Sequence, residues 1–389
     1  MNRNLWLLAV CQGLFLTNNV TFIAINGLVG LSLAPLGWMA TLPVMGYVVG
    51  SALSTGVVAR AQRQLGRKRS FQLGLAVAFL SALLCTYAAA TRNFWLLCFA
   101  TVVAGYYNAN AGLYRFAAAE LAAPAGREKA VSLVMAGGLL GAVIGPNLAA
   151  RTRDLFAVPF AGAYVSLAVV ALLAMALMHF LEFPPVPVRS AAASGRKLMQ
   201  IMAQPVFIVA AAAGSLGYGV MNLLMAATPI AMQQCRLPFS DTALVLEWHV
   251  IGMFAPGFFT GSLIKRFGPL PIMGAGVALN LVCIVVALSG VELQQFLVAL
   301  FLLGVGWNFL FTGSTTLSLS AYSPEEKDRA QGALNFFVFA TLAVSSLASG
   351  VLVTTQGWRL LNYGSLLPVT LTAVGLLWLA LRSGRPATA

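Results

Sequence analysis

The chain has 389 residues, of which 60% are hydrophobic and only 8% charged, and its formal net charge is +13. A soluble domain carries about 25% charged residues, so this composition excludes a water-soluble globule and indicates a chain surrounded largely by lipid. The positive charge does not predict nucleic-acid binding, because the sequence has no basic tail and its cations lie in short loops between apolar stretches.

Apolar stretches of about 18–25 residues recur along the chain without period-two alternation, so they predict membrane-spanning helices and not a β-barrel. The first stretch is too long for a cleavable signal peptide, and the short connections leave no room for a soluble domain. We predict twelve spans, at residues 5–31, 38–60, 71–91, 94–116, 131–150, 157–181, 205–232, 242–264, 271–290, 293–319, 332–354 and 360–382.

Residues 183–204 interrupt the apolar pattern with three prolines, a Ser/Ala run and three cations. Proline is unfavourable inside a helix and cations are costly in hydrocarbon, so this segment is expected to be a watery connector. It would separate an N-terminal six-helix bundle, 1–182, from a C-terminal one, 205–389. Most of the 23 Lys and Arg residues share one side of the membrane if both termini and the connector are cytoplasmic, as the positive-inside rule requires.

The two halves repeat each other with a period of roughly 200 residues. Asn108 precedes Pro124 by 16 residues, and Asn308 precedes Pro324 by the same 16. The basic loop LGRKR after the second span is echoed by KRFGPL after the eighth. Because each half has six spans, both begin in the cytoplasm, which predicts parallel repeats related by an axis along the membrane normal.

Six plus six spans, a central connector and a basic loop between spans two and three resemble the major facilitator superfamily over nearly the whole chain. In that family the loop reads roughly G-x-x-x-D-R-x-G-R-K. This chain keeps Gly66, Arg67 and Lys68 but has Arg63 where the family usually has Asp. The second copy keeps Gly268 and again has a cation at the Asp position. The resemblance therefore implies a gating loop that lacks its usual acidic partner.

Span five carries Gly141-x-x-x-Gly145-Pro146, which is similar to an antiporter motif of the family. Gly137 extends it to a stripe of small residues, and such stripes let membrane helices approach closely. The resemblance places spans two, five, eight and eleven at the seam between the halves. There the stripe would either let one half rock on the other or provide static packing. Pro146 and Pro256 are expected to kink spans five and eight.

Polar residues in the middle of a span are costly unless they are paired, which makes them site candidates. The resemblance implies that spans one, four, seven and ten line a central cavity, and all four carry amides or aromatic residues near mid-depth. Each amide could instead form an interhelical hydrogen bond. The predicted substrate-binding residues are Asn18, Asn19, Asn108, Asn110, Tyr218, Asn222, Trp307 and Asn308.

Among the ten acidic residues, Glu247 alone lies clearly inside a span, and His249 follows two residues later on the opposite side of the helix. We hypothesise that one of them, Glu247 in the first place, takes up and releases a proton during transport. The alternative is a carboxylate in an outer vestibule, paired with solvent or Arg236. Arg115, in span four, would either anchor an anionic group of a ligand or serve as an ordinary positive-inside residue.

The sequence contains no P-loop, metal-ligand spacing or catalytic arrangement, and its five cysteines are scattered, so no enzyme, cofactor or metal site is expected. The prediction is an all-α secondary transporter of a bacterial inner membrane, acting as a monomer by alternating access on a small, neutral or weakly charged organic solute. Relatives whose eighth span is similar to residues 248–268 include riboflavin carriers. Two alternatives stay open: a proton-coupled exporter of drugs or siderophore-like metabolites, and a non-transporting receptor with a transporter fold.

Overall fold

The computed structural model describes residues 3–123, 127–183, 196–323 and 326–383. All regular structure in these ranges is helical, with no strand. Most of the predicted connector lies outside the described residues, as do parts of the charged loops expected to repeat after spans four and ten.

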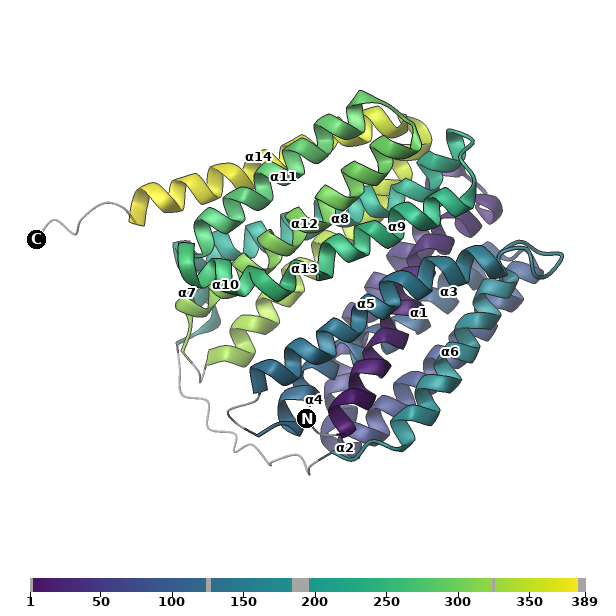
Figure 1. Ribbon diagram of the computed structural model, residues 1–389, viewed down its shortest axis with the longest axis horizontal. Coiled ribbons are helices and arrows are strands. Elements are labelled where there is room, and N and C mark those ends of the chain that lie inside the picture. Colours follow the sequence, from purple (N-terminus) through teal and green to yellow (C-terminus); the bar gives the residue numbers. More distant parts are fainter. Residues whose placement is uncertain (1–2, 124–126, 184–195, 324–325, 384–389) are drawn as a thin grey trace, which may run out of the picture.

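Figure 1 shows helices α1 to α6 on one side of the molecule and α8 to α14 on the other. The first half forms α1 (Arg3–Leu33), η1 (Gly37–Met39), α2 (Leu42–Ala90), α3 (Phe94–Ala111), α4 (Tyr114–Leu121), α5 (Arg127–Thr152) and α6 (Ala161–His179). The second half forms α7 (Leu198–Met202), α8 (Pro205–Gln234), α9 (Phe239–Phe254), α10 (Gly257–Phe267), α11 (Pro269–Ser289), α12 (Leu293–Ser318), η3 (Leu319–Ala321), α13 (Lys327–Thr355) and α14 (Gly357–Ser383).

Ten stretches of the described chain are long and apolar enough to cross a membrane, two fewer than the twelve predicted spans. The all-helical membrane architecture is thus confirmed, and the difference in number arises in two places. Two predicted spans, 38–60 and 71–91, fall in one 54-residue stretch, Gly37–Ala90. Predicted span 94–116 is divided between α3 and α4, and the amides near the end of α3 lower its hydropathy.

Glycine and proline lie where the long helices of both halves change direction or end. Gly66 (φ 77°, ψ 172°) and Gly268 (φ 83°, ψ 165°) adopt nearly the same positive-φ backbone, which other residues reach only with strain. At Pro256 the predicted kink separates α9 from α10, although Ala255 and Pro256 keep helical backbone angles between them. Pro146, in contrast, lies inside α5, and the helix continues through it.

Each half packs largely on itself. In the first half α1 lies against α5 and α6, and α2 lies against α3 and α6. In the second half α8 lies against α12, α13 and α14, and α11 lies against α12 and α14. Between the halves, α5 packs on α9, α13 packs on α2 and η1, and α1 packs on α8.

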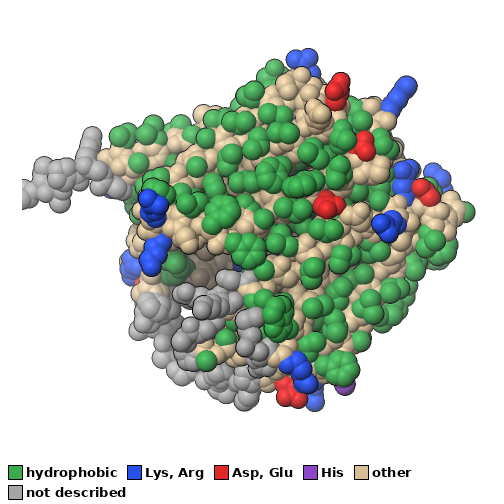
Figure 2. All heavy atoms as spheres, in the orientation of Figure 1, with side chains coloured by type: hydrophobic (Ala, Val, Ile, Leu, Met, Phe, Trp, Pro, Cys, Tyr) green, Lys and Arg blue, Asp and Glu red, His purple; other side chains and the backbone are tan. Residues whose placement is uncertain are grey.

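The halves meet at the end of the molecule opposite the connector. Thr41 Oγ1, before α2, donates to the carbonyl oxygen of Ser346 on α13 (2.6 Å). Arg153 lies over the rings of Phe160 (5.4 Å) and Phe239 (5.9 Å), one from each half, and these rings meet edge to face. At the other end the halves diverge in Figure 1, and Figure 2 shows a hollow in the surface on that side.

The glycine stripe of α5 packs against α1, within one half. A Cβ at Gly137 would overlap a carbonyl oxygen of α1, and one at Gly141 would lie 2.5 Å from the Thr17 amide nitrogen. A Cβ at Gly145 would lie 3.0 Å from the Thr17 carbonyl oxygen. These glycines therefore bring two helix backbones into contact, which corresponds to the static alternative and not to a sliding surface at the seam.

Candidate substrate site

A group of polar side chains, here called the amide cluster, joins α1, α2 and α3. It consists of Asn19, Tyr47, Ser51 and Asn108. Asn19 Nδ2 donates to the Tyr47 hydroxyl (3.0 Å) and to Asn108 Oδ1 (3.3 Å), and Asn108 Nδ2 donates to Ser51 Oγ (2.8 Å). Tyr47 and Ser51 are buried, whereas the two amides are half-buried. The predicted pair Asn19 and Asn108 is thus brought together, and each amide also donates a hydrogen bond to a buried hydroxyl.

A group of rings, here called the aromatic cluster, gathers on α8, α9 and α12. It consists of Tyr218, Phe254, Trp307 and Phe311. Trp307 stacks on Phe311, with centroids 5.2 Å apart and planes 10° apart. Tyr218 lies edge-on to both, at 5.1 and 5.3 Å, and Phe254 lies 6.2 Å from Trp307. Trp307 is only 7% exposed, whereas Tyr218 and Phe311 are half-buried and offer ring surface to a ligand.

The two clusters belong to different halves, and α1 and α8, which carry one residue of each cluster, pack on one another. Four predicted site residues, from α1, α3, α8 and α12, thus belong to clusters on the two sides of this contact between the halves. A ligand that bridged the two clusters would meet amides on one side and rings on the other.

Asn308, a predicted site residue, is 6% exposed and is used in packing at the break between α9 and α10. Its Nδ2 donates to the Met253 carbonyl (2.7 Å), and its Oδ1 accepts from Thr260 Oγ1 (2.7 Å). The break at Pro256 leaves carbonyls in the preceding turn without their helical donor, and an amide from the neighbouring helix supplies one.

Asn222 and Asn18 are also buried, each 6% exposed. Asn222 Nδ2 donates to Ser345 Oγ (2.9 Å) and Ser346 Oγ (2.8 Å), which joins α8 to α13. Asn18 lies one residue before Asn19 on α1 and takes no part in the hydrogen bonds of the amide cluster. In this structure Asn222 fits the interhelical alternative.

Asn110 belongs to a polar network at the connector end. Its Nδ2 donates to the Ser70 carbonyl (2.9 Å), and its Oδ1 accepts from Gln62 Nε2 (3.2 Å). Gln62 in turn accepts from Arg67 Nη1 (3.1 Å). Arg67 forms a two-point ion pair with Glu120 of α4, at 2.5 and 3.0 Å. Glu120 thus supplies an acidic partner for the arginine of the loop, in which a cation occupies the usual Asp position.

The two proton-coupling candidates have different surroundings. Glu247 is half-buried, and its Oε2 accepts from Asn147 Nδ2 (2.8 Å), which joins α9 to α5 across the two halves. His249 is fully buried, with Nδ1 2.6 Å from the Leu300 carbonyl. Its Nε2 has no hydrogen-bond partner in the described part of the chain. The described partner of Glu247 is thus Asn147, and not Arg236.

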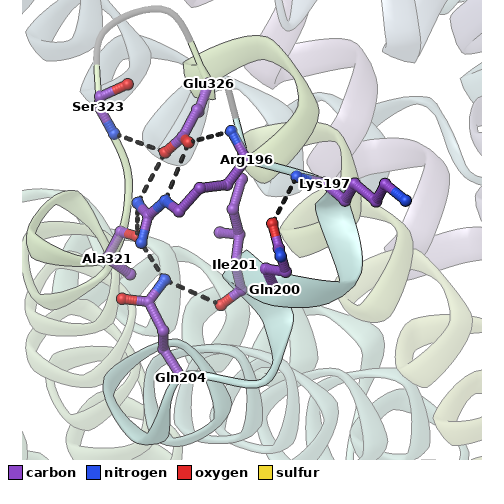
Figure 3. Close-up of polar contacts among 8 residues, drawn as sticks. All are labelled: Arg196, Lys197, Gln200, Ile201, Gln204, Ala321, Ser323 and Glu326. Carbon is purple, nitrogen blue, oxygen red and sulfur yellow. Dashed lines mark hydrogen bonds and ion pairs between the residues drawn. The ribbon is translucent and has the colours of Figure 1, made fainter. Parts of the chain in front are cut away.

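The described end of the connector is fastened to the second half. Arg196 donates to Glu326 through Nη2 (2.7 Å) and Nε (3.0 Å), and the Ser323 amide donates to the same carboxylate (3.0 Å). Figure 3 shows Arg196 and Gln204 both pointing to the Ala321 carbonyl oxygen. The Glu326 side chain is 3% exposed, and these hydrogen bonds, that from Arg196 first, lower its pKa to about 2.

Comparison with known families identifies the class. The family model of the Major Facilitator Superfamily matches residues 5–247 and 211–389. The chain belongs to the Major Facilitator Superfamily. The predicted resemblance to this superfamily is therefore confirmed, and the chain is a multi-pass membrane transporter.

Relatives of this superfamily member extend along the whole chain. The riboflavin transporter RfnT of Brucella anthropi is 37% identical over 366 residues, which cover 93% of this chain and 92% of the relative. The uncharacterized MFS-type transporter YddS of Bacillus subtilis is 27% identical over 355 residues, 86% and 81% of the two chains. The structure of the POT family transporter PepTSo matches with a TM-score of 0.73 at 10% identity, covering 98% of both chains.

Sequence reasoning for this MFS transporter missed Tyr47, Ser51 and Phe311. Tyr47 and Ser51 are four residues apart in the second predicted span, so they lie on one helix face, and this spacing was an available signal. Phe311 lies four residues after Trp307 on α12, so these two rings also share one helix face. Glu120 was not distinguished from other loop carboxylates, because nothing local marks it as the partner of Arg67.

Proposed function

We propose that this protein is a secondary transporter that moves a small, neutral or weakly charged heteroaromatic solute, riboflavin or a close analogue, by alternating access. The observation that supports the proposal is an amide cluster in one half and an aromatic cluster in the other, on halves that adjoin through α1 and α8. A planar ring with polar substituents fits such a pair of surfaces. The riboflavin transporter that is 37% identical along 93% of the chain supports the same substrate class.

The halves touch at the end that carries Thr41 and Arg153, and the surface is hollowed at the opposite end (Figure 2). These two features support one of the two states of alternating access, in which the site would open towards the hollowed end. We further propose twelve spans in two parallel six-helix repeats, 1–182 and 205–389, joined by a connector at 183–204. Gly66 and Gly268 support the repeat, since they hold nearly the same positive-φ backbone angles in the basic loops of the two halves. The positive-inside rule places both termini and the connector in the cytoplasm, and the protein would act as a monomer.

The test is counterflow of riboflavin in proteoliposomes containing the purified protein. We expect vesicles preloaded with unlabelled riboflavin to accumulate labelled riboflavin, and Asn108→Ala to reduce this uptake by at least about tenfold, as the loss of one or two buried hydrogen bonds to the solute predicts. If the folded protein gave no more uptake than vesicles without protein, riboflavin would not be its substrate. Binding without exchange would favour a receptor.

We also propose that Glu247 couples transport to protons. Its carboxylate accepts the hydrogen bond that joins α9 to α5, so protonation would weaken this charge-assisted hydrogen bond at a contact between the halves. The measurement compares riboflavin uptake with and without an imposed pH gradient. We expect Glu247→Gln to retain exchange in counterflow and to lose the response to the gradient. An unchanged response in the variant would refute this role.

A further inference from the structure

The amide cluster contains a chain of hydrogen bonds whose direction is fixed at one end, at Ser51. Ser51 is fully buried on α2, and its Oγ lies 2.8 Å from the carbonyl oxygen of Tyr47, one helical turn earlier. A carbonyl oxygen only accepts, so the single hydroxyl hydrogen of Ser51 is donated to it. Towards Asn108, 2.8 Å away, the Ser51 oxygen can therefore only accept, and Asn108 must present its Nδ2.

This direction continues through the two amides. Because Nδ2 of Asn108 donates to Ser51, its Oδ1 faces Asn19, and the Asn19 atom 3.3 Å away must be the donor Nδ2. The same Nδ2 also donates to the Tyr47 hydroxyl (3.0 Å). Turning either amide over would bring two acceptors or two donors face to face between Asn19 and Asn108. The network therefore assigns one orientation to each amide.

The oxygen of Asn19 is left as an open acceptor. Asn19 Oδ1 accepts no hydrogen bond from the described residues, and these residues do not enclose it. Asn19 is half-buried near the middle of α1, the helix that also packs on α8 of the other half. An amide oxygen without a donor at this depth is costly, so a donor group of a bound solute would gain a prepared partner.

Backbone contact keeps Ser51 beside Asn108. Gly105, three residues before Asn108 on α3, lies so close to α2 that a Cβ there would overlap the Ser51 amide nitrogen. Small residues permit this approach between membrane helices, and it holds the Ser51 hydroxyl next to the Asn108 amide. Removing the hydroxyl alone would keep this helix contact and would leave Asn108, and with it Asn19, free to turn over.

We infer that Asn19 Oδ1 accepts a hydrogen bond from an N–H or O–H group of the solute, and that Ser51 is the positioning residue that keeps this oxygen turned towards the solute. The inference rests on the proposed function and adds a polarity to the site. On riboflavin the donor is either the N–H of the ring or a hydroxyl of the side chain. A solute with a methyl group at that place would leave the oxygen unpaired and would bind more weakly.

The experiment removes the donor from the ligand and the positioning hydroxyl from the protein. Riboflavin is compared with 3-methylriboflavin, which lacks the ring N–H, and with lumiflavin, which has a methyl group in place of the hydroxylated chain. Quenching of flavin fluorescence gives the dissociation constants for the purified full-length protein and for Ser51→Ala and Asn19→Ala. Ser81→Ala is the matched control, because Ser81 is also buried on α2 and donates within its own helix, to the Ala78 carbonyl (2.9 Å). Thermal unfolding verifies that each variant is folded.

We expect wild type to bind at least one analogue about tenfold more weakly than riboflavin, as the loss of one hydrogen bond to a buried acceptor predicts. Asn19→Ala should abolish this ratio, and the analogue for which it does so identifies the donor. Ser51→Ala should reduce the same ratio to about threefold or less, because Asn19 no longer holds one orientation, and Ser81→Ala should keep it.

A purely structural role for Ser51 would weaken all three flavins by the same factor and leave the ratio unchanged, which would overturn the inference alone. Equal affinity of wild type for the three flavins, or a ratio that Asn19→Ala does not alter, would also overturn it while the proposed function stands. If folded wild type bound none of the flavins, the proposed function would be wrong as well.

Discussion

At the scale of single residues, the loop after the second predicted span requires a positive φ at Gly66. Its φ of 77° lies where an L-residue is strained, so Gly66→Ala should destabilise the protein by about 1–3 kcal/mol. Gly56, in the same helical run, has open space where a Cβ would lie and is the matched control. Gly56→Ala should be neutral or stabilising by about 0.5–1 kcal/mol, through helix propensity. Thermal unfolding in detergent measures both, and equal midpoints would contradict the strain.

Glu326 makes the fastening of the connector dependent on pH. Hydrogen bonds from Arg196 and Ser323 lower the pKa of the folded carboxyl from 4.5 to about 2. Its contribution to stability is therefore complete above about pH 4.5 and is lost as the pH falls from there towards 2. We expect Glu326→Gln to lower the unfolding temperature at pH 7 and to flatten its decline over that acid window. Glu292→Gln, an exposed carboxylate at the other end, should behave as wild type.

At the scale of helices, the α1–α5 seam depends on backbone contact at glycine. A Cβ at Gly141 would lie 2.5 Å from the Thr17 nitrogen and 2.6 Å from the Gly13 carbonyl oxygen. These are backbone atoms that cannot rotate away, so Gly141→Ala should cost about 1–3 kcal/mol of stability. Gly261→Ala on α10, where a Cβ meets nothing within 4 Å, is the control. Similar unfolding midpoints for the two variants would show that the seam can relax.

Some features of the helices can be predicted from the sequence, and others cannot. Apolar length predicts membrane helices, and proline predicts the break between α9 and α10. The coincidence of polar residues on four spans predicts a shared site, and two of these residues, Asn19 and Asn108, are hydrogen-bonded to each other. It could not separate them from Asn308, because the use of an amide is decided by its neighbour. Asn308 faces a carbonyl left by the break at Pro256, and that pairing exists only once α9 lies beside α12.

At the scale of the whole molecule, a cross-link at the contact between η1 and α13 can prevent the two halves from separating at this end. A Cβ at Gly37 would lie 3.9 Å from the Thr354 Cβ, a separation at which disulfides form. We expect the Gly37→Cys, Thr354→Cys double variant to form a disulfide on mild oxidation and to lose solute exchange. Reduction should restore exchange, and the single variants should be insensitive to oxidant. Full exchange by the oxidised double variant would refute separation of the halves at this end.

Arg153 between the rings of Phe160 and Phe239 has a bearing on ionic strength. When this end opens, Phe239 moves away with its own half, while the guanidinium keeps Phe160 and the nearby carboxylate of Asp154. No opposite charges are pulled apart at this contact, only an arginine and one ring face, and mobile salt screens such a contact less than it screens an exposed ion pair. The barrier to separating the halves at this contact should therefore be nearly the same at low and at high salt concentration.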